Sequence, residues 1–196
     1  MDSDDWPPID VDLHLLELTF DGLSDEQALR KVRATIRGLL VGEIRRCLVG
    51  LPVGEPIGLA ALMLSLAAID ILGGIYRGSQ ATFVTFGDFV REFMPGYDPK
   101  MMRVLRNKVL HEYVIPAEIV VMYADDRAAQ HLGSAPEFPT KVVLHVPSVA
   151  EDVDKAAERM LLAAKADSRL ARAIIDGTSS SLLMMGSVTD LCRAPR

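Results

Sequence analysis

Residues 57–76 read IGLAALMLSLAAIDILGGIY, and this stretch decides the fold. It is apolar on nearly every side and rich in alanine and glycine, so it leaves no polar face for water. Such a helix belongs at the centre of a bundle or in a dimer interface. Its charge-free run from Ile57 to Ile69 has only 13 residues, whereas a membrane span needs about 18. We therefore predict a buried core helix over about 56–76 and no membrane segment.

One carboxylate, Asp70, interrupts this apolar helix. A carboxylate in such surroundings needs a partner, commonly an arginine, or it must bind a proton. Two interpretations remain open from the sequence alone. Asp70 is either half of a structural ion pair or a supporting residue of a functional cleft.

Capping signals and apolar periods place further helices on both sides of the core helix. Ser24 to Gln27 forms a capping box, and the helix that it opens should end near Gly50. Phenylalanines recur with the helical period before residue 94, and Asp98-Pro99 is typical of a helix start. A second capping box begins at Ser148. The predicted helices span about 24–49, 80–94, 99–112, 148–166 and 168–176, the last ended by Gly177.

The period changes after Pro116. Residues 114–123 and 140–146 alternate like strands, and turn-forming residues separate them. We therefore expect a β hairpin at 114–146. The predicted fold class is mainly α: a bundle of four to five core helices with a small β hairpin appendage before a C-terminal helix. The predicted organisation is an acidic N-terminal arm (1–22), a single helical domain (23–176) and a C-terminal tail (177–196).

Charge is unevenly distributed along the chain. Residues 1–21 hold seven acids and no Lys or Arg, which leaves 21 bases against 20 acids in the remainder. An acidic arm on a nearly neutral body does not indicate general nucleic-acid binding, and it offers a surface for a protein partner. Arg30, Arg33 and Arg37 follow at helical spacing and form either a solvated face or a phosphate-facing stripe. A local basic patch would also include Arg45, Arg46, Lys100, Arg103 and Lys108.

Several common classes of site find no support in the sequence. The four histidines lie in different segments, and the two cysteines are far apart, so we expect no metal site. There is no serine-nucleophile elbow and no glycine-rich dinucleotide fingerprint, so we expect no cofactor. The N-terminus does not resemble a secretory signal, and the unpaired cysteines favour a reduced cytoplasmic setting.

The chemistry depends on residues 105–113, LRNKVLHEY. A histidine can take a proton from a ribose 2′-hydroxyl, and an arginine can hold a phosphate through its bidentate fork. On an ideal helix Asn107 and His111 share a face, whereas Arg106 and His111 differ by about 140°. We therefore expect Arg106 to join them only by curling round the helix or at an interface. The spacing from Arg106 to His111 alone is what chance supplies in this composition, although Asn107 is the only asparagine.

The string R106-N107-x-x-x-H111-x-Y113 at the end of a helix resembles the HEPN superfamily (higher eukaryotes and prokaryotes nucleotide-binding domains). The resemblance covers about residues 30–165. It implies a helical bundle that dimerises and brings two Arg/His pairs to a shared cleft. Many members are metal-independent ribonucleases of toxin–antitoxin or phage-defence systems. By position, the resemblance makes Arg106 the phosphate-binding residue and His111 the general acid/base, with Asn107 in support and Tyr113 placed to stack or hydrogen bond.

Two functions follow as alternatives. The first is a HEPN-like, metal-independent endoribonuclease that works as a homodimer on RNA. The second is a non-catalytic helical dimer, either an interaction protein or a nucleotide-binding protein. In the second, Arg106 pairs with Asp70 and His111 bonds locally, so the same residues are structural. Whether the protein is an enzyme is therefore left open at this stage.

Overall fold

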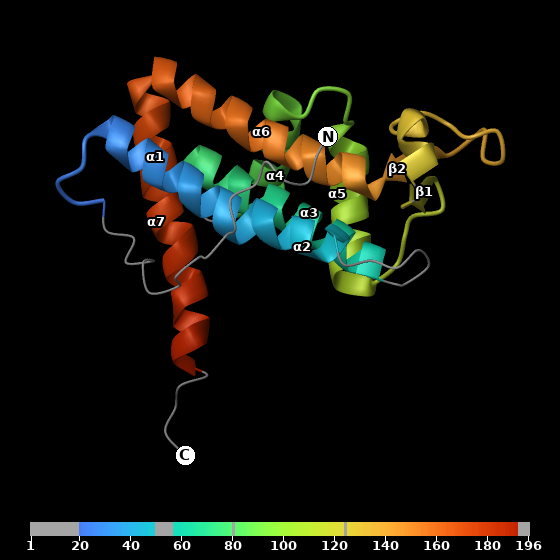
Figure 1. Cartoon of the computed structure of the whole chain (residues 1–196), viewed down its shortest axis with the longest axis horizontal. Helices are drawn as coiled ribbons and strands as arrows, with labels where there is room; N and C mark the ends of the chain where they lie inside the picture. The colour runs from blue at the N-terminus through green and yellow to red at the C-terminus, as the bar shows by residue number, and fades with distance from the viewer. Residues whose placement is uncertain (1–19, 50–56, 80, 124, 192–196) are drawn as a thin grey trace.

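The apolar helix predicted at 56–76 lies in the middle of the helical assembly, as α3 (Ile57–Arg77). A computed structural model describes residues 20–49, 57–79, 81–123 and 125–191 of the chain. Helices from both halves of the chain pack around α3, and residues such as Leu62, Leu66 and Ile69 are fully buried there. The prediction of a mainly helical fold with a small two-stranded β element is confirmed (Figure 1).

The helix predicted from Ser24 to Val49 is continuous but not uniform. Ser24 caps α1 (Asp25–Thr35), and the reciprocal bonds between Ser24 and Gln27 confirm the capping box. A π-helical segment, η3 (Ile36–Val41), then leads into α2 (Gly42–Val49). α1 packs against α7 and α6, whereas η3 and α2 pack against α3 and α6.

The phenylalanine-rich helix and the helix after it lie against the other side of α3. α4 (Phe83–Phe93) buries Phe86, Phe89 and Phe93 in the core, as its apolar stripe predicts. Asp98 caps α5 (Pro99–Asn107), again as predicted. The last turn of the predicted helix 99–112 is wound differently, as the π-helical turn η4 (Lys108–Glu112).

The two predicted strands exist, but the predicted hairpin is wrong. β1 (Ile119–Met122) and β2 (Val142–His145) pair in parallel, with Ile119 opposite Val142. Residues 123–141 connect them and include the 3₁₀ helix η5 (Asp125–Gln130). A connection of that length allows the crossover that parallel strands require. The other edge of β2 bonds to Leu132 and Gly133, so the connection itself covers it.

The capping box predicted at Ser148 does not form, because the helix begins earlier. α6 (Val146–Ala166) begins two residues before Ser148, with Pro147 in its first turn and His145 at the N-cap position. Proline is favoured in the first turn because its missing N–H has no helical partner there. The Ser148 hydroxyl instead lies 2.8 Å from Nδ1 of His145.

Gly177 does not end the last helix, contrary to the prediction. α7 runs through it from Ser168 to Leu191. A Cβ at Gly177 would lie 2.6 Å from the backbone oxygen of Ile75 in α3, closer than side chains approach backbone. The glycine therefore permits two helices to touch, and the predicted tail 177–196 is helical as far as Leu191.

The acidic arm, residues 1–22, lies outside the described residues except for 20–22. In the described part of the chain, α3 is the one helix long and apolar enough to cross a membrane by length and composition. Two thirds of its most apolar window, 67%, is buried inside the fold. A core helix meets the same criterion, in keeping with the predicted buried core helix.

Candidate functional site

The π-helical turn η4 brings Arg106 and His111 together. A π turn closes hydrogen bonds between residues five apart and so contains one residue more than an α turn. Here the backbone N–H of Tyr113 donates to the carbonyl of Lys108, five residues earlier. Nη1 of Arg106 consequently lies 3.0 Å from Nε2 of His111. An ideal α-helix would place the two side chains about 140° apart, and the expectation that Arg106 reaches His111 only by curling round or at an interface assumed that geometry.

Arg106 is the centre of the hydrogen-bonded group. Its Nε and Nη2 both donate to Oδ2 of Asp70, the former at 2.8 Å. Its Nη1 donates to Oδ1 of Asn107 at 3.0 Å as well as to His111. The structure therefore gathers four of the five predicted site residues around one guanidinium: Asp70, Arg106, Asn107 and His111.

Asp70 holds the guanidinium from the core side. Its side chain is only 10% exposed, compared with 20% for Arg106. One carboxylate oxygen takes both N–H groups, while the other, Oδ1, is buried and has no hydrogen-bond partner in the described part of the chain. The arginine that the lone carboxylate requires is Arg106, and the pair fixes the plane in which Arg106 presents its remaining donors.

The outer part of the group faces solvent. His111 is exposed, and so is Glu112 next to it. The Glu112 carboxylate bonds to Nζ of Lys108 at 2.6 Å instead of engaging the histidine. An anion approaching His111 thus meets a carboxylate that a lysine partly neutralises.

Tyr113 lies outside this group. It ends the π turn in the left-handed conformation, with φ of 57°, and is 69% exposed. Its side chain makes no hydrogen bond or ring contact with the residues that the structure describes. Its place directly after the turn leaves the ring free to contact a bound molecule.

Two arginines of the predicted stripe, Arg33 of α1 and Arg37 of η3, face acids of α6, whereas Arg30 pairs with Glu26 of its own helix. Arg33 bonds to Glu158 at 2.8 Å, and Arg37 lies 3.2 Å from the same carboxylate. Arg45 bonds to Asp154 at 2.8 Å. The hydrogen bond with Glu158 raises the pKa of Arg33 above its ordinary value. These arginines connect two helices, so the wider basic patch considered from the sequence is largely neutralised.

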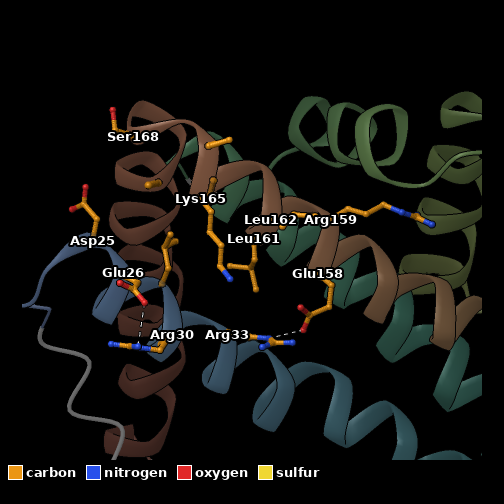
Figure 2. A pocket seen from close by; sticks show the side chains of 14 residues that line it. Asp25, Glu26, Arg30, Arg33, Glu158, Arg159, Leu161, Leu162, Lys165 and Ser168 are labelled. Carbon is orange, nitrogen blue, oxygen red and sulfur yellow. Dashed lines mark hydrogen bonds and ion pairs between the residues drawn. The ribbon is translucent and has the colours of Figure 1, made fainter.

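A groove lies between α1, α6 and the start of α7, away from Arg106. Its volume is about 1070 Å³, and its floor is apolar, with Leu29 and Leu161 among the lining residues. Figure 2 shows Arg33 of α1 bonded to Glu158 of α6, and Arg30 turned toward Glu26 of its own helix. Lys165 is exposed and makes no ion pair within the described residues. The groove combines apolar surface with charged groups of both signs.

A second polar cluster was not anticipated from the sequence. The Tyr97 hydroxyl donates to Oδ2 of Asp152 at 2.9 Å and lies 2.8 Å from Nε2 of His131. Nδ1 of His131 accepts the backbone N–H of His145, so in the neutral ring the proton is on Nε2. The cluster joins the loop before α5, the β1–β2 connection and α6. Since these segments are far apart in the chain, no spacing pattern could have revealed it.

Burial and hydrogen bonding shift two pKa values in this cluster. Burial raises the pKa of the Tyr97 hydroxyl, and the negative charge of Asp152 adds to the effect. Burial alone would raise the pKa of Asp152, but the hydrogen bonds from His131 and Tyr97 outweigh it. The pKa of the Asp152 carboxyl is therefore below its ordinary value. The cluster is partly buried and supports the β element.

Comparisons with family models, curated proteins and solved structures found no match to this chain. Any statement about its function therefore rests on the residues and geometry described above.

Proposed function

We propose that the chain is a HEPN-like, metal-independent endoribonuclease, with Arg106 and His111 as its catalytic residues. The observation that carries the proposal is the 3.0 Å contact between Arg106 Nη1 and His111 Nε2 on an exposed turn. Asp70 and Asn107 act as positioning residues, because both hold the guanidinium. Phage defence or a toxin role would suit such an activity.

The reaction that suits these groups is attack by a ribose 2′-hydroxyl on the adjacent phosphorus. His111 takes the 2′-proton as the oxygen–phosphorus bond forms, and the bond to the 5′-oxygen breaks. The departing 5′-oxygen takes a proton from water and His111 gives its proton back to solvent, so the products carry a 2′,3′-cyclic phosphate and a 5′-hydroxyl. Arg106 stabilises the extra negative charge on the phosphate oxygens during the transfer. No metal ion takes part in these steps.

A homodimer is part of the proposal. In an in-line displacement the attacking 2′-oxygen and the leaving 5′-oxygen lie on opposite sides of the phosphorus, so one histidine is poorly placed to reach both. A second copy of the chain supplies a second histidine. Exposed apolar side chains on two of the helices favour such an interface: Leu64 of α3 and Val104 of α5 are 37% and 51% exposed. Sedimentation of the full chain tests this part, and a monomer at micromolar concentration would contradict it.

The test of the activity is cleavage of several unstructured and structured RNAs in the presence of a chelator. The wild-type protein should cut, and His111→Ala should lose at least about 100-fold in rate, the usual contribution of a general acid/base. The new ends should be a 2′,3′-cyclic phosphate and a 5′-hydroxyl. Equal cleavage by both proteins, or none by the wild type on any RNA, would refute the proposal.

Glu112→Gln is the matched control. Glu112 neighbours His111 on the same turn and is also exposed, but its carboxylate bonds only to Lys108 among the described residues. The variant should cleave RNA within about twofold of the wild type and melt at a similar temperature, because surface changes of this kind have small effects. A loss of activity comparable to that of His111→Ala would mean that the turn, not the imidazole, is what matters.

The groove of Figure 2 favours a second candidate function, nucleotide binding without catalysis. Leu29 and Leu161 in its lining suit a base, and Lys165, which makes no ion pair among the described residues, suits phosphate. Calorimetric titration with a nucleoside triphosphate tests this alternative. Binding that Lys165→Ala weakens about tenfold would support it, and absence of binding to the wild type would exclude it.

A further inference from the structure

The hydrogen bond between Arg106 and His111 defines the protonation state of the imidazole. A guanidinium has donors only, so Nε2 of His111 must accept the N–H of Arg106 Nη1. The ring is then neutral and carries its proton on Nδ1. In that form Nε2 is the one basic nitrogen of the ring, and Arg106 already occupies it. His111 cannot take a proton from a substrate while this hydrogen bond is made.

The donors of Arg106 are almost all in use. Of the five N–H groups of a guanidinium, two are given to Asp70, one to Asn107 and one to His111. The fifth, on Nη2, has no acceptor among the residues that the structure describes. A phosphate held by two parallel hydrogen bonds needs two N–H groups on one edge of the guanidinium.

Only one edge of the guanidinium can be offered to a phosphate in this way. Asp70 occupies the edge formed by Nε and Nη2, and this carboxylate is buried and held by the core. The remaining two-donor edge joins Nη2 to Nη1. Both protons of Nη1 are committed, to Asn107 and to His111. A phosphate at this edge must therefore take over an Nη1 hydrogen bond.

We propose that a phosphate bound at the Nη1–Nη2 edge of Arg106 displaces His111 and thereby releases Nε2 as a base. The inference rests on the proposed function for its ligand, an RNA phosphodiester, and it adds the step that makes the histidine available. The exchange is non-covalent: Nη1 donates to a phosphate oxygen in place of the imidazole nitrogen. His111 is the group that moves, because it is exposed on the last turn of a helix, whereas Asn107 is only partly exposed and Asp70 holds the other edge of Arg106.

This arrangement couples substrate binding to acid/base chemistry within one side-chain group. Without phosphate, Nε2 of His111 accepts a hydrogen bond from Arg106, the residue that later holds the substrate. With phosphate, the charge of Arg106 is compensated by the ligand, and Nε2 faces the 2′-hydroxyl instead of an N–H donor. A site of this kind binds anions without a metal and activates its base only when the anion is present.

The first experiment observes the His111 ring nitrogens by NMR in ¹⁵N-labelled full-length protein, at a pH where the ring is neutral. Inorganic phosphate is the probe. We expect the Nε2 resonance of His111 to move as phosphate is added, because its hydrogen bond to Arg106 is lost. The double variant Asp70→Asn/Arg106→Gln keeps the buried pair uncharged and should abolish the shift. Phosphate binding that leaves the ring resonances unchanged would overturn the proposal.

The second experiment uses the reciprocity of coupled binding. If phosphate must displace the imidazole, removing it should help phosphate: His111→Ala should bind inorganic phosphate about 2- to 10-fold more tightly than the wild type, the usual worth of one hydrogen bond. A histidine that helps to hold the phosphate would have the opposite effect. Weaker binding by His111→Ala, or no phosphate binding by the wild type, would overturn the proposal.

These outcomes are distinct from those of the RNA cleavage assay. If phosphate moves His111 but no RNA is cut, the exchange at Arg106 stands and the ribonuclease function falls. If RNA is cut in a His111-dependent manner but phosphate leaves the ring unchanged, the function stands and the exchange falls.

Discussion

Gly177 of α7 lies directly against the backbone of Ile75 in α3, where a Cβ would be 2.6 Å from the carbonyl oxygen. Replacing a glycine by alanine inside a helix ordinarily stabilises the helix by about 1 kcal/mol. Here the added methyl group forces α7 away from the core helix. We therefore expect Gly177→Ala to lower the free energy of unfolding by about 1–3 kcal/mol, the usual cost of overpacking, as measured by chemical denaturation.

Gly58→Ala is the matched control for that variant. The three atoms nearest to its Cβ all belong to the ring of Tyr123, which is 42% exposed and can turn away. Stability close to the wild type, or above it, is expected. If the two substitutions had the same effect, close approach of α7 to α3 would not be the reason for Gly177.

The buried ion pair of Asp70 and Arg106 should be strongly coupled. Removing one partner leaves a charge in the core side of the bundle, which typically costs about 3–5 kcal/mol. Asp70→Ala and Arg106→Ala should each destabilise by this order, and the double variant by clearly less than their sum. Thermal and chemical unfolding of the four proteins give the coupling energy.

Lys108 and Glu112 provide the internal comparison for this cycle. They form an ion pair on the adjacent turn, but their side chains are 45% and 52% exposed. Their coupling should stay below about 0.5 kcal/mol, as for other exposed helical pairs. Similar coupling energies for both pairs would argue against a special structural role for Asp70.

The parts of the fold that were predictable from the sequence depend on local patterns. The apolar stretch 57–76 has no polar face, so its burial follows from composition alone. Ser24 and Gln27 form their capping box because both hydrogen bonds join residues three apart. The lone Asp70 likewise indicated that it has a charged partner. Only the folded structure shows that this partner is Arg106.

The errors arose where the outcome depends on distant segments or on backbone winding. The strand pattern at 119–122 carries no information about the direction of its partner, which is parallel. Ser148 satisfies the spacing of a capping box, but Pro147 begins the helix earlier. Residue types do not reveal that η4 is a π turn, and this turn is what brings His111 to Arg106.

The capping box at Ser24 should contribute measurably to stability. Its hydroxyl accepts the backbone N–H of Gln27 at 3.3 Å at the start of α1. Ser24→Ala removes this acceptor and should cost about 1 kcal/mol, whereas Ser24→Asp retains it and should be nearly neutral. Urea denaturation of the two variants measures the difference. Equal losses would indicate that the hydroxyl contributes little.

Asp152 should make the stability of the protein depend on pH in the acid range. The hydrogen bonds from Tyr97 and His131 lower the pKa of its carboxyl in the folded state, against the opposing effect of burial. Its contribution is therefore fully present above the pKa of an unfolded aspartate, about 3.9, and is lost as the pH falls through the lower folded value. Unfolding in urea between pH 6 and pH 2, about two units on either side of that value, should show a steeper loss for the wild type than for Asp152→Asn. Tyr97→Phe removes one of the two donors and should give an intermediate slope, and parallel curves for all three proteins would contradict this account of the cluster.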